Sequence, residues 1–332
     1  MHNTPSNPDR SKRVLMLGAT GTIGRATVAA LLEQGHSVTC LIRPRGPDTP
    51  PLGLPEGVSL RYCDVTDPAA LRDQGIRGDR FDVLVSCMAS RTGAPDDAWR
   101  IDHRATVDAI AAAKGAGVGH VVLLSAICVQ KPLLGFQRAK LAAEQALVAS
   151  GLTYSIVRPT AFFKSLSGQI ARVQAGKPFL LFGDGTLTAC KPISDGDLSR
   201  YIADCLTDPA CTNRVLPIGG PGPAITPRDQ AEMLFRLMGQ TPRFRRVPVG
   251  MMDGIIATLE ALGQLSPRFR GKAGLARIGR YYATESMLLL NPETGHYEAA
   301  ATPETGSDTL ADHYARVLRG EVSVDLGDHA VF

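Results

Sequence analysis

Residues 13–38 read RVLMLGATGTIGRATVAALLEQGHSV, and this stretch decides the fold. An apolar strand runs into a glycine-rich turn, which opens an amphipathic helix without proline and then a second apolar strand. Gly18, Gly21 and Gly24 form a G-x-x-G-x-x-G pattern at the exit from the first strand. Gly18 permits the sharp exit, Gly21 lets another molecule approach the backbone, and Gly24 permits close packing of the helix on the sheet. The stretch therefore predicts a parallel βαβ unit.

A turn of this kind is typical of sites that bind a dinucleotide. Because the helix begins at the turn, its free N–H groups face the position of a pyrophosphate. A glycine triplet also occurs in an ordinary βα turn, but its place between an apolar strand and an apolar-periodic helix favours the dinucleotide. The residues expected at this cofactor are Gly18, Thr20, Gly21, Thr22, Ile23 and Gly24.

Strand-like runs continue along the chain and alternate with helical patterns. This rhythm predicts an α/β protein with a doubly wound parallel sheet, the Rossmann arrangement. After about residue 160 the rhythm loosens, and we expect the late segments to fold over the carboxyl ends of the strands and build a pocket. The expected strands are 14–18, 37–42, 59–63, 82–87, 120–125 and 153–158.

Three parts of the chain follow from this pattern. Residues 1–12 are polar and rich in Pro and Asn, without the apolar segment of a signal peptide, and we expect a disordered tail. Residues 13–159 are expected to form the dinucleotide-binding Rossmann domain. Residues 160–332 are expected to form a smaller substrate-binding region, partly interleaved with the Rossmann sheet.

Composition excludes several classes of function. The chain has 332 residues, 44% of them hydrophobic, and a net charge of +4 with its basic residues scattered, so we expect no nucleic-acid partner. No run approaches the roughly 18 apolar residues of a membrane-spanning helix. The 7 cysteines include no C-x-x-C pair, which favours reduced thiols in a cytosolic compartment and no metal site.

The end of the second strand indicates which dinucleotide binds. NAD enzymes usually carry Asp or Glu there to bind the ribose diol, whereas this chain has Arg43, with Arg45 two residues on. A guanidinium suits a 2′-phosphate in charge and geometry, so we predict NADPH. A solvated loop arginine is the alternative.

Later strand ends provide the remaining cofactor contacts that we expect. Asp64 follows the third strand and is placed to meet the adenine, with a helix cap before Pro68 as the alternative. The loop after the fourth strand, Met88, Ala89 and Ser90, is expected beside the cofactor, as is Pro159 at the end of the sixth strand.

Residues 125–140, SAICVQKPLLGFQRAK, resemble the catalytic segment of short-chain dehydrogenases of the extended kind. In those enzymes a serine closes a central strand, and a tyrosine four residues before a lysine donates a proton to a substrate oxygen. Ser125 and Lys140 stand at the expected spacing, and the resemblance implies that Lys140 holds the nicotinamide ribose. The tyrosine position is Phe136, which has no proton to give. A carbon–carbon double bond therefore fits the site better than a carbonyl.

A helical stripe distinguishes the late region. Met251, Met252, Ile255, Ile256, Leu259 and Leu262 fall on one face of a predicted helix. Ordinary packing, a wall for a large flat ligand and a membrane-surface helix are the three interpretations. Basic residues surround this helix, and one or two of them are candidates for a substrate carboxylate: Arg243, Arg245, Arg246, Arg268, Arg270, Lys272, Arg277 and Arg280.

Several strings together resemble a specific family, the NADPH-dependent 8-vinyl reductases of divinyl chlorophyllide or protochlorophyllide, within the atypical short-chain dehydrogenases. The resemblance runs from about residue 13 to beyond residue 300, and the phenylalanine at position 136 agrees with the family pattern. Residues 258–274, TLEALGQLSPRFRGKAG, depart from it. The strings are VLLSAICVQKPLLGFQRAK (122–140), TYSIVRPTAFFKSL (153–166), FGDGTLTACKPIS (182–194), LPIGGPGPAITP (216–227) and IGRYYATESML (278–288).

The resemblance implies hydride transfer from NADPH to the C8 vinyl group of the pigment, followed by protonation to an ethyl group. Water, Lys140 and Lys164 are the candidate proton donors. Phe136, Phe162 and Phe163 are expected to form an apolar floor against the tetrapyrrole, with core packing as the alternative.

The resemblance also implies a role in chlorophyll or bacteriochlorophyll biosynthesis. We expect a bacterial cytoplasmic enzyme with a possible peripheral contact to photosynthetic membranes. Two other functions of the same fold are alternatives: an NADP-sensing regulator without catalysis, and an enone or phenylcoumaran-type reductase.

Overall fold

The computed structural model describes residues 11–44, 52–91, 93–264 and 266–323. The strands are β1 (Arg13–Leu17), β2 (Ser37–Ile42), β3 (Ser59–Tyr62), β4 (Val83–Ser86), β5 (His120–Leu124), β6 (Thr153–Pro159), β7 (Phe179–Phe182), β8 (Arg214–Ile218), β9 (Phe244–Val247), β10 (Leu289–Leu290) and β11 (Tyr297–Glu298).

Helices follow most of the strands. They are α1 (Thr22–Glu33), α2 (Pro68–Ala70), α3 (Pro95–Ala98), α4 (Thr106–Gly115), α5 (Gly135–Ala149), α6 (Phe163–Leu166), α7 (Ile170–Gln174), α8 (Asp195–Asp204), α9 (Pro227–Leu237), α10 (Val249–Gly263), α11 (Pro267–Thr284) and α12 (Leu310–Leu318). Leu71–Ile76 and Trp99–Ala105 are π-helical, and Ile127–Gln130 and Pro209–Cys211 are 3₁₀ turns.

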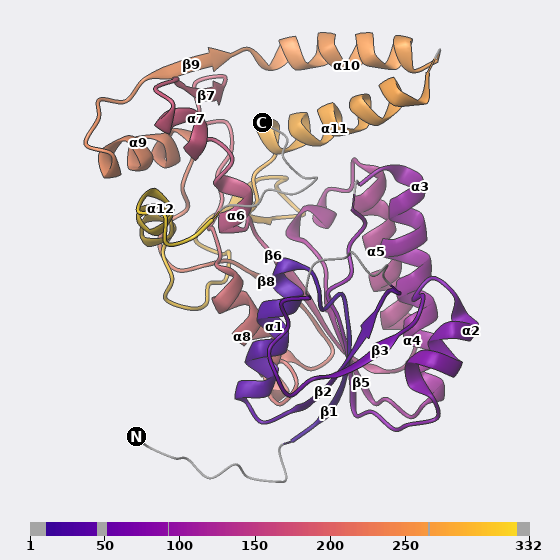
Figure 1. The fold of residues 1–332 in the computed structure, drawn as a ribbon. Coiled ribbons are helices and arrows are strands. Elements are labelled where there is room, and N and C mark those ends of the chain that lie inside the picture. The colour runs from indigo at the N-terminus through magenta and orange to yellow at the C-terminus, as the bar shows by residue number, and fades with distance from the viewer. Residues whose placement is uncertain (1–10, 45–51, 92, 265, 324–332) are drawn as a thin grey trace, which may run out of the picture.

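Seven parallel strands form the central sheet, in the order β3-β2-β1-β4-β5-β6-β8. The six strands predicted from the sequence are confirmed, and the order reverses between β1 and β4, where Leu17 pairs with Ser86. Helices α1 and α8 cover one face, and α4 and α5 cover the other (Figure 1). The doubly wound Rossmann fold is therefore confirmed, and ligands of such sheets bind at this switch point.

After residue 160, strand β8 and helix α8 return to the sheet, and the other elements build a second part. Strand β8 pairs with β6, whereas β7 and β9 pair with each other and share a core with α9 and α12. Helices α10 and α11 form a hairpin that reaches over the end of the sheet at which the strands finish (Figure 1). Helix α11 therefore lies on the same side of the sheet as the glycine turn that follows β1 (Figure 1).

The start of the chain differs from the expectation. Residues 1–10 of the expected tail lie outside the described part. Ser11 and Lys12, however, contact the Rossmann domain, because the Ser11 hydroxyl donates to the Gly35 carbonyl and the Lys12 N–H donates to the His36 ring. The predicted tail of 1–12 is therefore too long at its inner end.

The hairpin helix α10 is not packed as an ordinary core helix. Met251, Ile255 and Leu262 are 51%, 46% and 37% exposed, whereas Ile256 is buried. The packing interpretation of this stripe is therefore wrong for its outer residues. Among the described residues, no helix combines the length and the apolar character needed to cross a membrane.

Candidate active site

The glycine turn is built by close backbone contacts. Gly18 has φ +76°, and a side chain at this position would meet the Cys87 carbonyl carbon at 2.5 Å and the Met88 nitrogen at 2.7 Å. A side chain at Gly24 would collide with the Gly18 carbonyl oxygen. At Gly21 the nearest atom would be 3.5 Å away. Two glycines thus permit the packing of strand and helix, and Gly21 leaves its outer face open for a ligand.

Helix α1 begins at this turn with free N–H groups. Its N-cap, Gly21, makes no side-chain cap, and no acidic residue lies in the first turn. Thr20 and Gly21 are exposed and Thr22 is half-buried, while Ile23 anchors the turn in the core. The helix terminus therefore offers uncapped N–H donors and a partial positive charge to an anion.

Lys164 lies at the same helix terminus. Its ammonium donates to the Thr22 hydroxyl at 3.3 Å, across 142 residues of sequence. Nearby Asp195 is desolvated, which raises the pKa of its carboxyl group, and Lys164 partly offsets this effect. The sequence interpretation assigned Lys164 to the substrate, whereas the structure places it beside the turn expected to bind pyrophosphate.

Arg43 and Asp64 lie exposed at the ends of neighbouring strands. Asp64 accepts hydrogen bonds from the Thr66 N–H at 2.9 Å and the Thr66 hydroxyl at 2.7 Å, which lower the pKa of its carboxyl group, with a smaller effect from Arg43. The cap of helix α2 is Asp67, so the capping alternative for Asp64 is wrong. Arg45 lies outside the described residues.

Lys140 is held by a carboxylate that the sequence did not indicate. Its ammonium lies 3.0 Å from Asp102 Oδ1, and the Asp102 side chain is fully buried. The same oxygen accepts the Ser90 N–H at 3.1 Å. Asp102 therefore connects the catalytic-segment lysine to the loop Met88–Ser90, in which Met88 and Ser90 are buried and Ala89 is exposed.

A small cavity joins these groups to Ser125. Met88, Asp102, Ser125 and Lys140 are among the residues that line it. Two buried oxygens here, Ser125 Oγ and Asp102 Oδ2, have no hydrogen-bond partner among the described residues. A buried polar atom without a partner is costly unless a ligand or water satisfies it. The open face of Gly21, the uncapped helix and these unpartnered oxygens fit a dinucleotide along the carboxyl ends of β1, β4 and β5.

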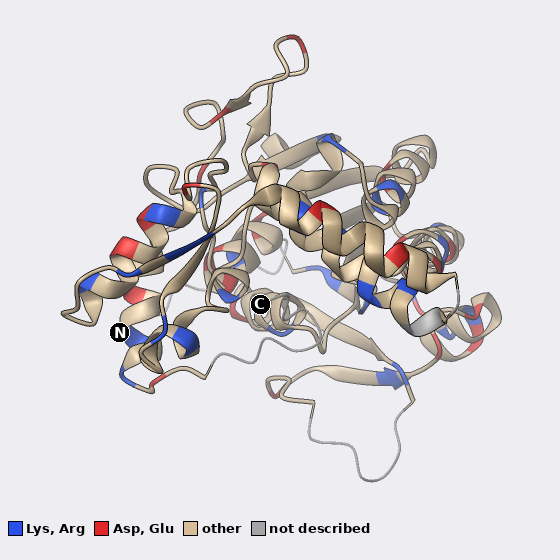
Figure 2. Cartoon of the chain, turned by 90° about the horizontal axis from the view of Figure 1, so that it is seen from above, with Lys and Arg blue, Asp and Glu red and all other residues tan. Residues whose placement is uncertain are grey.

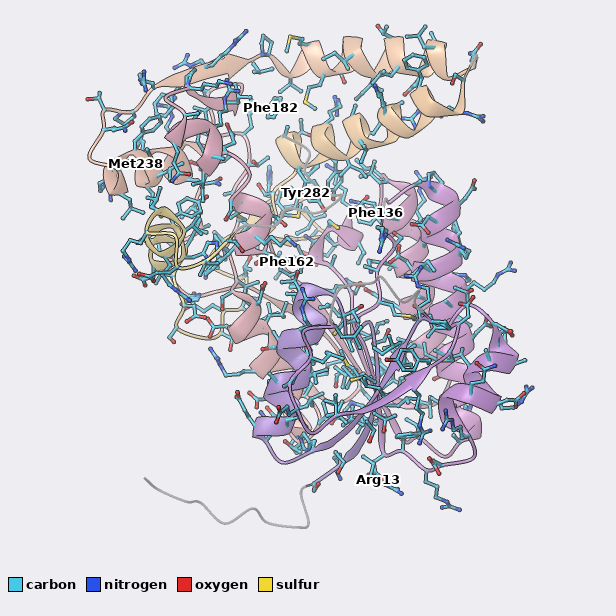
Figure 3. All side chains as sticks on the ribbon, in the orientation of Figure 1. Arg13, Phe136, Phe162, Phe182, Met238 and Tyr282 are labelled. Carbon is cyan, nitrogen blue, oxygen red and sulfur yellow. The ribbon has the colours of Figure 1, made fainter. Side chains whose placement is uncertain are left out.

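Phe136 lies in an apolar cluster where the Rossmann domain meets the hairpin. It packs against a cluster that includes Cys128, Tyr281 and Met287. A side chain at Gly93 would lie 3.1 Å from Ile278 of α11 and 3.9 Å from the Phe136 ring. The ring is half-buried and faces the underside of α11, near the labelled Tyr282 (Figure 3).

The other two phenylalanines have different surroundings. Phe162 is half-buried and pairs with Ile193 in an isolated bridge. Phe163 is only 4% exposed and packs in the C-terminal core, its ring 5.4 Å from that of His313. The packing alternative therefore describes Phe163, while Phe136 and Phe162 keep a partly exposed surface. Pro159 is buried at the end of β6, opposite Ile218 of β8.

Comparison with known proteins agrees with this geometry. Residues 18–209 match the protein family described as NAD(P)H-binding. The chain is 50% identical to the divinyl chlorophyllide a 8-vinyl-reductase of Oryza sativa subsp. indica over 96% of this chain and 82% of the rice protein. It is 46% identical to the enzyme of the same name from Arabidopsis thaliana, over 98% and 82% of the two chains.

The chain belongs to the divinyl chlorophyllide a 8-vinyl-reductase family. Among solved structures, an NADPH-dependent quinone oxidoreductase from Escherichia coli, complexed with NADPH, has a similar fold. Its TM-score is 0.67 at 19% identity, covering 92% of this vinyl-reductase family member and 99% of the E. coli chain.

Proposed function

We propose that this protein reduces the 8-vinyl group of divinyl chlorophyllide a to an ethyl group, with NADPH as the reductant. The observation that carries this proposal is the 46–50% identity to four reductases of that name over nearly the whole chain. The phenyl ring at position 136 supports it, because reduction of a vinyl group produces no oxyanion that requires a tyrosine acid.

We assign separate tasks to the residues around the cofactor. Bound NADPH supplies the hydride. The N–H groups of the first turn of α1, from Thr22 onward, would hold the diphosphate beside the open face of Gly21, and Arg43 would pair with the 2′-phosphate, since a guanidinium matches that dianion. Lys140, oriented by Asp102, would hold the nicotinamide ribose, and the unpartnered Ser125 hydroxyl is available to the same end of the cofactor.

The pigment would lie between the Rossmann domain and α11. Phe136 and Phe162 keep partly exposed ring surface there, and a flat macrocycle packs well on aromatic rings. Negative charge that develops on the inner vinyl carbon is delocalised into the conjugated macrocycle. The site therefore needs to orient the pigment and deliver one proton.

We extend the proposal to a peripheral membrane contact through α10. Exposed Met251, Ile255 and Leu262 share one side of this helix, and Arg245 and Arg246 lie exposed in the preceding strand β9. Apolar side chains flanked by arginine suit the surface of an anionic bilayer. The fraction of protein that sediments with vesicles of anionic lipid should decrease when Met251 and Ile255 are replaced by Ser. Fractionation of the cells tests the expected cytoplasmic location.

The decisive experiment is incubation with NADPH and divinyl chlorophyllide a while the Soret band is followed. A shift with stoichiometric NADPH oxidation is expected, and parallel assays with divinyl protochlorophyllide a measure which macrocycle is preferred. Binding of NADPH without oxidation in the presence of any tetrapyrrole would indicate the sensing regulator instead. Turnover of enones but not of the pigment would indicate the enone-type reductase.

A further inference from the structure

The proposed reaction requires a donor for the proton that the inner vinyl carbon receives, and water, Lys140 and Lys164 are the candidates from the sequence. Phe136 carries no proton to donate. The Lys140 ammonium is bound by Asp102, and the Lys164 ammonium lies beside Thr22 at the start of α1. Both lysines thus face the expected cofactor, so the search for an acid moves to the opposite wall, which is helix α11.

Tyr282 lies on the side of α11 that faces Phe136. Ile278 stands one helical turn earlier, and residues spaced by four share a helix face. A side chain at Gly93 would contact both Ile278 and the Phe136 ring. The Ile278 face of α11 is therefore directed toward the apolar cluster that contains Phe136. Figure 3 shows Tyr282 between α11 and the Rossmann domain, in the region of Phe136.

The two adjacent tyrosines of α11 differ in what their hydroxyls do. The Tyr281 hydroxyl is directed at the Cys128 and Lys131 carbonyl oxygens, at 3.1 and 3.2 Å, so its proton is engaged in holding the 3₁₀ turn. The Tyr282 ring packs edge-on against the Tyr281 ring, with the centroids 5.6 Å apart, and within the described ranges its hydroxyl donates to no carbonyl or carboxylate. Tyr282 is 42% exposed, so its ring is accessible to a ligand.

The surroundings keep this hydroxyl protonated. Desolvation raises the pKa of Tyr282 well above its ordinary value, with smaller contributions from Cys128 and Tyr281. Burial likewise raises the pKa of the Cys128 thiol to about 11, which Gln137 and Lys140 partly offset. Cys128 and Tyr281 belong to the apolar cluster against which Phe136 packs, so this end of α11 lies next to the Phe136 ring.

We propose that Tyr282 is the catalytic acid, whose hydroxyl donates a proton to the inner carbon of the 8-vinyl group. The inference rests on the proposed vinyl reduction. The vinyl π bond breaks, the terminal carbon gains the hydride delivered by NADPH, and the inner carbon forms a C–H bond as the Tyr282 O–H bond breaks. NADPH is oxidised to NADP⁺, the vinyl group is reduced to ethyl, and the tyrosinate takes a proton from water.

The test is Tyr282→Phe, with Tyr281→Phe as a matched control one residue away. Removing a general acid costs about 10²- to 10⁴-fold in rate. For Tyr282→Phe we expect a loss of kcat in this range, with dissociation constants for NADPH and pigment, measured by fluorescence, within about threefold of the wild type. For Tyr281→Phe we expect a lower melting temperature, because two carbonyls lose their donor, and a kcat near that of the wild type.

The outcomes separate the two proposals. If the wild type reduces the pigment and Tyr282→Phe does so at an undiminished rate, Tyr282 is not the acid, while the proposed function stands. A loss of kcat accompanied by equal weakening of pigment binding would make Tyr282 a binding residue and overturn the inference. A folded, NADPH-binding wild type that leaves the pigment unchanged would contradict the proposed function and this inference together.

Discussion

Phe136 occupies the position at which related dehydrogenases carry an acidic hydroxyl, and its ring is packed against Cys128, Tyr281 and Met287 instead. The consequence is chemical as well as structural. A site without this hydroxyl is unsuited to protonating an alkoxide, yet its apolar ring can support a flat pigment. We therefore expect single side chains to determine which substrate and which cofactor the fold accepts.

Phe136→Tyr should not increase the rate of vinyl reduction. No substrate oxygen awaits a proton here, and the added hydroxyl would enter an apolar cluster without a partner. Phe136→Leu should keep partial activity, because it retains apolar bulk. Initial rates of the Soret shift at saturating NADPH and pigment measure both. A clear gain for Phe136→Tyr would show that a missing acid limits the rate.

Arg43→Ala should weaken NADPH binding. Loss of a charge-assisted hydrogen bond costs about 1.5–3 kcal/mol, which is about 10- to 100-fold in the dissociation constant. NADH, which lacks the 2′-phosphate, should bind as weakly to the variant as to the wild type. Arg72, which pairs with Asp73 and is 68% exposed, provides the control variant Arg72→Ala. Equal affinity of the wild type for the two cofactors would contradict the assignment.

At the scale of elements, short helices and loop ends bring charges to the cofactor turn. Helix α6 follows β6 and positions Lys164 at the first turn of α1, where the helix N–H groups have no side-chain cap. The π-helical segment before α4 carries Asp102 beneath Lys140. Both contacts join elements that are distant in sequence. Both lie at the carboxyl ends of the strands, near the place where the strand order reverses.

Lys164→Ala should raise the dissociation constant of NADPH about five- to tenfold, because a half-exposed ammonium contributes less than a buried one. The effect should shrink as salt increases, since screening weakens the contact. Quenching or enhancement of NADPH fluorescence at two salt concentrations measures it. Lys177→Ala, at an exposed position, is the control. An unchanged NADPH dissociation constant for Lys164→Ala would show that Lys164 does not bind the cofactor and would favour its assignment to the substrate.

At the scale of the whole molecule, the α10–α11 hairpin extends over the end of the sheet at which the strands finish (Figure 1). Arg277 and Arg280 pair with Glu260 and Asp253 and so hold the two helices together. Acidic and basic residues are interspersed over the rest of the chain (Figure 2). We therefore expect net charge to contribute little to pigment binding, and the orientation of the pigment to come from individual contacts with α11 and the aromatic rings.

The pigment carries vinyl groups at both C3 and C8, so its orientation determines the product. Its propionate is the asymmetric group that an arginine or lysine of the late region can bind, and Arg270 and Lys272 lie exposed on α11. Esterifying the propionate should weaken binding and reduce the preference for C8 over C3, as measured by product analysis. Unchanged affinity with exclusive C8 reduction would show that shape alone orients the macrocycle.

The stability of the fold should fall in mild acid. Burial lowers the pKa of His36, His120 and His313 below the ordinary value of 6.5, so the unfolded chain binds more protons as the pH drops. Their contribution is complete above about pH 6.5 and is lost as the pH falls through the lowered pKa values. The urea midpoint should therefore be lower at pH 5.5 than at pH 7.5. His313→Gln should flatten this dependence, while exposed His296→Gln should not.

The features that the sequence determined by itself are those that depend on residues close together in the chain. The glycine turn, the six strands and the absence of a tyrosine at position 136 are all legible within a few residues, because strand alternation, turn geometry and motif spacing depend on neighbours in the chain. The N-cap of α9 is a further case. The Thr226 side chain accepts the Asp229 N–H, as the Thr-Pro-x-Asp pattern predicts.

What only the tertiary structure decided is which distant residues meet. Lys164 reaches Thr22 across 142 residues, and Tyr281 reaches Cys128 across 153, so neither contact leaves a trace in local spacing. In the sequence Asp102 cannot be distinguished from other helical carboxylates, and only the structure shows it buried against Lys140. Likewise, only the structure shows that Phe163 is in the core while its neighbour Phe162 is half-buried. The physical reason is that burial and charge pairing depend on how elements pack in space, and packing is a property of the folded chain as a whole.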